Sequence, residues 1–134
     1  MEHWEELKPG GLRFVWADHL FRPGTDTFLL SSLPRLRPGL RVCDLGCGTG
    51  LLGLLLMQRQ PDLRIAGLDI QPEAAALARR AAAENGLTER LDFRCGDLRQ
   101  VRGIFPTGCF DLVVCNPPYY PPAGGKLSAD GARR

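Results

Sequence analysis

The chain has 134 residues, of which 44% are hydrophobic, and this length suits one domain with a single core. Its formal charge of +2 is too small to indicate nucleic-acid binding by itself, although all of its 17 basic residues except Lys8 and Lys126 are arginine. No apolar run is long enough to cross a membrane and the acidic N-terminus is unlike a signal peptide, so a cytoplasmic location is expected.

The first predicted elements are a hairpin or flap and a helix. Residues 11–22 alternate apolar and polar side chains around Ala17-Asp18, which indicates a short hairpin. A helix should begin at Gly24-Thr25-Asp26, where a threonine or an aspartate can cap it, and should end at Pro34. We expect four apolar residues to form its buried face: Phe28, Leu29, Leu30 and Leu33.

Strands and helices alternate through the rest of the chain. Strands are predicted at residues 41–45, 63–70, 91–94 and 110–115, and helices at 51–60, 71–85 and, at most briefly, 97–101. Parallel strands joined by helices form an α/β sheet with right-handed crossovers. The last residues, from 117 onward, are rich in proline, glycine and arginine and are expected to be unstructured.

A glycine-rich turn, Asp44-Leu45-Gly46-Cys47-Gly48-Thr49-Gly50, joins the first of these strands to its helix. Glycines there let the backbone approach a ligand, and the helix N-terminus favours a carboxylate or a phosphate. The same glycine pattern also serves dinucleotides. Asp44 favours S-adenosylmethionine, because its carboxylate can receive an ammonium group but would repel a pyrophosphate.

Acidic residues also follow the second and third strands. Asp69 can accept hydrogen bonds from both hydroxyls of a ribose, and Asp97 can accept one from the amino group of an adenine. Asp69 alone fits a nicotinamide dinucleotide equally well, and Asp97 can instead cap the following helix. Both residues belong to the carboxyl edge of the sheet, where open α/β folds bind their ligands.

The fourth strand runs into Asn116-Pro117-Pro118-Tyr119. The two prolines lack backbone N–H groups and fix φ, which keeps the carbonyls and the Asn116 side chain available as acceptors. A proline-rich turn that merely ends a strand has the same composition. The agreement with the three acids at the ends of the other strands favours a site that grips a planar nitrogen nucleophile.

In this order, these motifs resemble the class I S-adenosylmethionine-dependent methyltransferases that methylate amino groups. Gly24-Thr25-Asp26, the apolar residues after it and Tyr120 make the chain similar to the bacterial tRNA1(Val) adenine N6-methyltransferase family. The resemblance extends over roughly residues 10–122. It implies a Rossmann-like α/β fold with a parallel sheet in the order 3-2-1-4 and helices on both faces.

The resemblance also implies an organisation of the chain. An N-terminal segment or hairpin at residues 1–24 would precede a cofactor-binding methyltransferase domain at 25–122, and an unstructured tail would occupy 123–134. The family continues for further strands and helices after its Asn-Pro-Pro-Tyr segment. The chain is therefore expected to lack C-terminal strands and to be a poor catalyst alone.

The site residues follow from the same resemblance. The catalytic residues would be Asn116, Pro117, Pro118 and Tyr119, and the cofactor-binding residues Asp44, Gly46, Cys47, Gly48, Gly50, Asp69, Ile70, Asp97, Leu98 and Asn116. The Asn116 side-chain oxygen and the Pro117 carbonyl would accept hydrogen bonds from the adenine amine and aim its lone pair at the methyl group. Tyr119 would stack on the unpaired base.

Several alternatives remain open from the sequence. Enzymes that methylate a guanine amino group in ribosomal RNA, or a glutamine of release factors, also use Asn-Pro-Pro-Tyr. A cofactor-binding fragment without catalysis is another possibility, and a nicotinamide dehydrogenase a more distant one. No metal is expected, because the five cysteines have no paired spacing and only two histidines are present. The expected macromolecular partner is tRNA, and the oligomeric state is left open.

Overall fold

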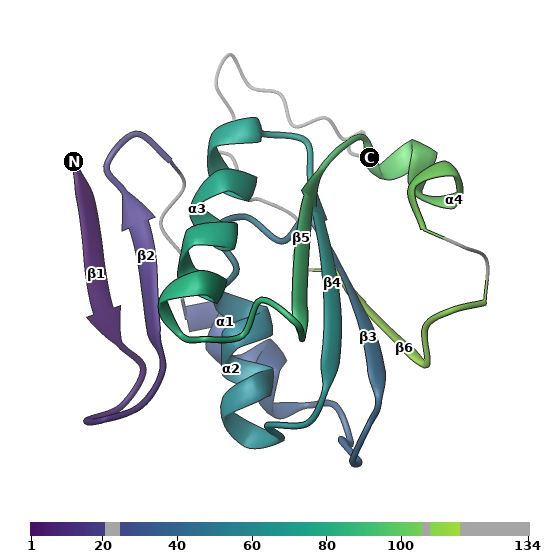
Figure 1. Ribbon diagram of the computed structural model, residues 1–134, viewed down its shortest axis with the longest axis horizontal. Coiled ribbons are helices and arrows are strands. Elements are labelled where there is room, and N and C mark those ends of the chain that lie inside the picture. The colour runs from purple at the N-terminus through teal and green to yellow at the C-terminus, as the bar shows by residue number, and fades with distance from the viewer. Residues whose placement is uncertain (21–24, 106–107, 116–134) are drawn as a thin grey trace.

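The computed structural model describes residues 1–20, 25–105 and 108–115 (Figure 1). The predicted catalytic stretch at 116–119, Tyr120 and the predicted tail at 123–134 lie outside the described residues.

A parallel sheet of four strands forms the centre of the molecule. Its strands are β3 (Arg41–Leu45), β4 (Arg64–Asp69), β5 (Leu91–Cys95) and β6 (Leu112–Cys115), and they lie in the order β5-β4-β3-β6. Numbered along the chain, this order is the predicted 3-2-1-4, which is therefore confirmed. All three strand pairs are parallel, so the carboxyl ends of the strands meet at one edge of the sheet.

Helices cover both faces of the sheet, as expected. On one side lie α1 (Thr25–Ser32), α2 (Leu51–Arg59) and α3 (Pro72–Glu84), and on the other lie the 3-10 turn Leu98–Gln100 and α4 (Val101–Ile104) (Figure 1). The alternation along β4 explains the two layers. Ile65 joins the hydrophobic cluster under α2 and α3, whereas Ala66 and Leu68 join a second, smaller cluster with Phe105 on the α4 side.

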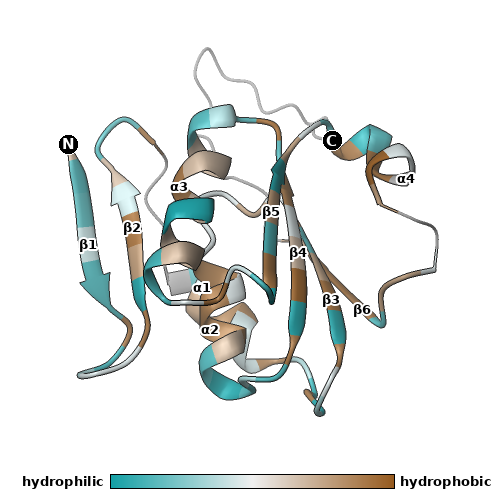
Figure 2. Cartoon of the chain, in the orientation of Figure 1, coloured by the Kyte–Doolittle hydropathy of each residue, from teal (hydrophilic) through white to brown (hydrophobic). Residues whose placement is uncertain are grey.

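The hydrophobic residues follow this layering. Figure 2 shows them concentrated along α2 and the strands of the parallel sheet, whereas β1 is mostly hydrophilic. In α2 six residues are buried, Leu51, Leu52, Gly53, Leu54, Leu56 and Met57. A helix that is apolar on most of its surface is buried on most of its surface, and α2 lies between the sheet and the N-terminal strands.

An antiparallel hairpin forms a third layer outside the helices (Figure 1). It pairs β1 (Glu2–Glu6) with β2 (Arg13–Ala17), with Trp4 opposite Val15. The predicted hairpin centred on Ala17-Asp18 is therefore wrong, because 13–17 is the second strand of the pair. The acidic β1 is largely exposed, so it carries little of the apolar alternation by which a strand is recognised.

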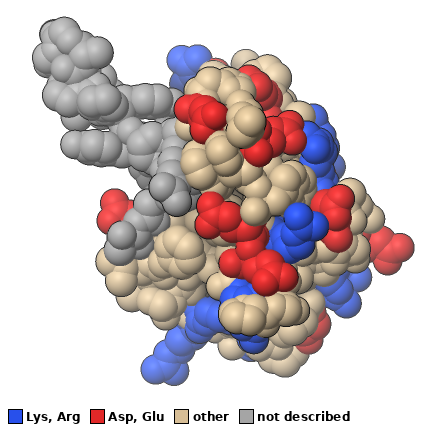
Figure 3. All heavy atoms as spheres, turned by 90° about the vertical axis from the view of Figure 1, so that its left-hand side faces the viewer, with Lys and Arg blue, Asp and Glu red and all other residues tan. Residues whose placement is uncertain are grey.

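The hairpin is held on α3 by ion pairs at its margin. Arg80 pairs with Glu2 at 2.6 Å, Arg13 lies 3.6 Å from Glu84, and His19 bonds Glu73 at the start of α3. Figure 3 views this side of the molecule and shows acidic and basic side chains interspersed, with a band of acidic residues across its centre. Because β2 buries apolar residues against the helices, the hairpin shares its core with the α/β layers.

The buried face of α1 differs from the expectation. Phe28, Leu29 and Leu33 are 44%, 60% and 74% exposed, whereas Thr27 and Ser31 are both 6% exposed. The two small residues are one turn apart, and they let the helix approach α2 closely. The carbonyl of Ser31 accepts a hydrogen bond of 2.6 Å from Arg59 at the end of α2. Leu30 is half-buried against the main hydrophobic cluster, so apolar character alone predicted only part of the buried side of this helix.

Candidate functional site at the carboxyl edge of the sheet

Asp44 is a fully buried acid near the end of the central strand β3. Its neighbours in register are Gly67 of β4 and Val114 of β6, and its side chain is 0% exposed. Among the described residues neither carboxylate oxygen has a hydrogen-bond partner. Burial, and secondarily the charge of Asp69, raise the pKa of Asp44 to about 8. A buried carboxyl without a donor is costly, which marks this position as one that suits a cationic ligand group.

The glycine turn after Asp44 is held by hydrogen bonds to the next strand. The backbone N–H groups of Gly46 and Cys47 both donate to the Leu68 carbonyl, at 2.8 and 3.0 Å. Gly46, Gly48 and Gly50 have positive φ values of 76°, 55° and 92°. Side chains with a Cβ are disfavoured in this region, so the turn requires these glycines.

Most of the N–H groups in the turn are used within the protein. Besides Gly46 and Cys47, Gly48 donates to Asp69 at 2.8 Å and Gly50 donates to the Cys47 carbonyl at 2.9 Å. These four groups are therefore not free donors for a ligand. Beside Gly48, a Cβ would meet nothing within 4 Å in the described part of the chain.

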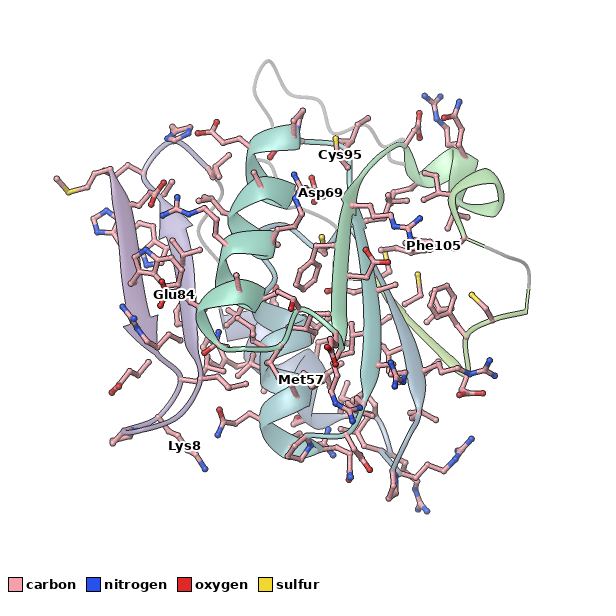
Figure 4. All side chains as sticks on the ribbon, in the orientation of Figure 1. Lys8, Met57, Asp69, Glu84, Cys95 and Phe105 are labelled. Atoms are coloured by element: carbon pink, nitrogen blue, oxygen red, sulfur yellow. The ribbon has the colours of Figure 1, made fainter. Side chains whose placement is uncertain are left out.

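Asp69 ends β4 beside this turn (Figure 4). It is 8% exposed, and each of its oxygens accepts one backbone hydrogen bond, Oδ2 from Gly48 at 2.8 Å and Oδ1 from Gln71 at 2.9 Å. These two bonds fix the orientation of the carboxylate. Each oxygen keeps further acceptor capacity toward the edge of the sheet, as a pair of hydroxyl groups would need. The next residue, Ile70, is 61% exposed at the same edge.

Asp97 follows β5 and caps the short helical turn after it. Its Oδ1 accepts a hydrogen bond from the Arg99 backbone at 2.9 Å, and its Oδ2 lies 2.6 Å from the Arg99 guanidinium. These hydrogen bonds lower the pKa of Asp97 to about 2. The capping role predicted as an alternative is thus confirmed, and a contact with adenine stays a prediction. Leu98 is half-buried against the α4 cluster.

Cys47 is a packing residue within the turn. Its thiol is buried, and burial, followed by the charges of Asp44 and Asp69, raises its pKa far above the ordinary value. A thiol that does not ionise is not a nucleophile. The side chain instead fills space against Gly67, where an added Cβ would lie 2.9 Å from the Cys47 Cβ.

Thr49 is a buried polar residue of the turn that was not predicted to belong to the site. This residue is 5% exposed, and its hydroxyl has no hydrogen-bond partner among the described residues. It lies between Gly48 and Gly50, five residues after Asp44. Its position as a polar residue inside the glycine motif is the one feature of the sequence from which it could have been predicted. Two unpartnered polar side chains thus belong to the same strand-to-helix connection.

Other kinds of site find no support in the described residues. Over residues 1–20, 25–105 and 108–115, no group of three or more metal-ligating side chains comes together. None of the helices in those ranges has the length and hydropathy needed to span a membrane.

Curated tRNA methyltransferases are among the proteins that this sequence resembles. The sequence is 38% identical over 123 residues to a tRNA1(Val) (adenine(37)-N6)-methyltransferase of Yersinia enterocolitica. The alignment covers 87% of this chain and 49% of that protein. The chain thus spans about half the length of the curated relatives it matches.

Solved structures resemble the fold. TrmN from Thermus thermophilus has a TM-score of 0.60 and 30% identity, covering 70% of this chain and 28% of its own. A S-adenosylmethionine-dependent methyltransferase from Geobacter sulfurreducens, solved with S-adenosyl-L-homocysteine, has a TM-score of 0.58 and 27% identity, covering 74% and 39%. The methyltransferase small domain family matches residues 10–129. With this match over most of its length and the predicted sheet order, the chain belongs to the methyltransferase small domain family.

Proposed function

We propose that the chain binds S-adenosylmethionine at the carboxyl edge of its sheet and serves the methylation of an adenine amino group in tRNA. The observation that carries the cofactor proposal is Asp44, a buried carboxyl with no donor among the described residues. The ammonium group of a methionine moiety supplies the missing donor and the missing positive charge. The tRNA substrate rests on the names of relatives that are 37–38% identical.

The residues at this edge fit such a cofactor. Asp44 suits an ammonium group, and Asp69 holds two carboxylate oxygens in fixed positions for a ribose. Among the described residues none would contact a Cβ at Gly48, so a ligand can lie against the backbone there. The cofactor, when bound, supplies an electrophilic methyl group on a sulfonium centre.

Each residue has a separate task in this proposal. Asp44 loses its proton to become the partner of the ammonium group, and its burial shields that ion pair from water. Asp69 orients the ribose through bonds that its own backbone partners fix in advance. Asn116 and the Pro117 carbonyl accept hydrogen bonds from the amine, and Tyr119 stacks on the base.

The cofactor proposal is tested by calorimetry with S-adenosylhomocysteine on the native chain and on Asp44→Asn. We expect the variant to bind about 30-fold more weakly, because loss of one partner of a buried charge pair costs about 2 kcal/mol or more. Asp62→Asn is the matched control, since Asp62 precedes β4 at the opposite edge of the sheet. Equal affinity of the native chain and Asp44→Asn would contradict the assignment.

The substrate proposal needs a second assay. Labelled S-adenosylmethionine is incubated with unmodified tRNA, with a ribosomal RNA fragment and with a release-factor peptide that contains glutamine. Label in tRNA adenine supports the proposal, whereas label in guanine or glutamine redirects it to those enzymes. Binding without any transfer would identify the chain as a cofactor-binding unit. Asn116→Ala should abolish transfer, because its side-chain oxygen accepts a hydrogen bond from the reacting amine in this proposal.

A further inference from the structure

The ring of Phe93 occupies space that three glycines leave open. Phe93 lies in β5 and is 2% exposed. A Cβ added to Gly67 would lie 2.5 Å from Cδ1 of this ring, and one added to Gly50 would lie 3.2 Å from its Cζ. At Gly53 the corresponding distance is 3.4 Å. The aromatic ring therefore packs directly against the backbone of β4 and of the first turn of α2.

These contacts lie beside the elements that build the cofactor site. Gly67 directly precedes Leu68, whose carbonyl holds the glycine turn, and it is two residues before Asp69. Gly50 ends the glycine turn and its carbonyl accepts the hydrogen bond of Leu54 in α2. The ring thus lies between β4 and the start of α2 and sets the separation between them.

Gly48 and Gly50 both have the positive φ that favours glycine, but their surroundings differ. In the described part of the chain, a Cβ added to Gly48 would meet nothing within 4 Å. Gly50 instead faces Phe93 and the Cβ of Ala78, each 3.2 Å from its would-be Cβ. At Gly50 the close approach of the Phe93 ring is therefore a second reason for glycine, besides the positive φ.

We infer that Phe93 is a positioning residue for cofactor binding. Its ring holds the glycine turn and the end of β4 at the spacing that aligns Asp44 and Asp69 on one ligand. The hydrogen bond of 2.8 Å between Gly48 and Asp69 spans this spacing. The inference rests on the proposed function, since it names a residue that supports the same site without touching the ligand.

The first test compares two truncations of the same kind, Phe93→Val and Phe14→Val. Both phenylalanines are buried in strands and belong to the same hydrophobic cluster, but Phe14 lies in the hairpin strand β2. Affinity for S-adenosylhomocysteine is measured by calorimetry, and thermal unfolding by circular dichroism. We expect both variants to lose thermal stability, while only Phe93→Val binds about tenfold or more weakly. If Phe93→Val does not fold, Phe93→Leu and Phe14→Leu give the same comparison.

The second test is rescue. Gly67→Ala places a Cβ 2.5 Å from the ring and 2.9 Å from the Cys47 Cβ, and should weaken binding about tenfold or more. Phe93→Val relieves the closer of these two contacts, so Gly67→Ala combined with Phe93→Val should bind more tightly than Gly67→Ala alone. Equal affinity losses for the Phe93 and Phe14 variants, or simply additive losses in the double variant, would overturn the inference. Absence of binding by the native chain would instead refute the proposed function, and the inference would fall with it.

Discussion

Proton release on cofactor binding is the most specific consequence of the buried Asp44. Burial first, and the Asp69 charge second, raise its pKa to about 8, and no donor among the described residues offsets this. The thiols of Cys43, Cys47 and Cys115 are titratable groups that interact with it, and their pKa values are all raised, so they remain neutral near pH 7. Asp44 is therefore expected to be protonated in the free protein at neutral pH.

The size of the effect follows from this pKa. With a pKa of about 8, the carboxyl is roughly ten times more often protonated than ionised at pH 7. Binding an ammonium group requires the ionised form, which costs about 1.4 kcal/mol, or about tenfold in affinity, for each pH unit below the pKa. The α-amino group of the ligand must be protonated to bind, and it loses its proton only at higher pH. Affinity should therefore fall about tenfold for each pH unit below about 8.

The assay is calorimetry with S-adenosylhomocysteine in pairs of buffers that differ in ionisation enthalpy. At about pH 6.5 Asp44 gives up its proton while the ligand is already charged, so we expect release of about 0.9 proton. At about pH 9 Asp44 is already ionised and the ligand must gain a proton, so the sign reverses to net uptake. Binding with no proton release at about pH 6.5 would refute this account of Asp44.

Three further predictions concern stability. Asp44→Asn should stabilise the ligand-free protein by a few kcal/mol at pH 8. A carboxyl with a raised folded-state pKa stabilises the fold at low pH and loses that contribution as pH rises from about 4 to 8. Equal free energies of unfolding for the native chain and the variant at pH 8, measured with denaturant, would contradict this. Gly86→Ala should lower the free energy of unfolding by about 1 kcal/mol, since Gly86 has a φ of 68° after α3. Gly103→Ala, inside α4 with open space around it, is the control and should be neutral or stabilising. Asn85→Ala should increase the rate of amide hydrogen exchange in β2. The Asn85 side chain accepts a hydrogen bond from the Arg13 N–H at 2.9 Å and donates one to the Arg13 carbonyl at 2.7 Å. An unchanged exchange rate would show that the apolar contacts alone hold the hairpin.

The parallel sheet was predictable because its signals are local. Strands buried on both faces are continuous apolar runs, and glycines or prolines mark where the strands and helices meet. The helix at α3, for example, has proline in its first turn and Gly86 after its end. The sheet order came from the family resemblance, since strand order depends on contacts that no local pattern records.

The errors have a common physical origin in tertiary packing. The sequence of α1 offers Phe28 and Leu29 as core residues, but close contact with α2 selects the small residues Thr27 and Ser31 instead. The strand β1 is recognisable only through its partner β2. In each case the neighbouring element, and not the hydrophobicity of the segment, decides which side is buried.

In the candidate site, too, features with local sequence signals were predictable and features that depend on tertiary contacts were not. The placement of Asp44, Asp69 and the glycine turn at the carboxyl edge of the sheet was predictable from the sequence, because strand ends are marked locally. The internal use of the turn's N–H groups and the packing of Phe93 on Gly67 were not, since both join residues that are distant along the chain.

The most direct test of the central claim is a crystal structure of the chain with S-adenosylhomocysteine. The account predicts that the amino group of the ligand lies within hydrogen-bond distance of the Asp44 carboxylate and that the ribose hydroxyls lie on Asp69. A bound ligand that leaves Asp44 without a partner, or that lies elsewhere on the molecule, would contradict it.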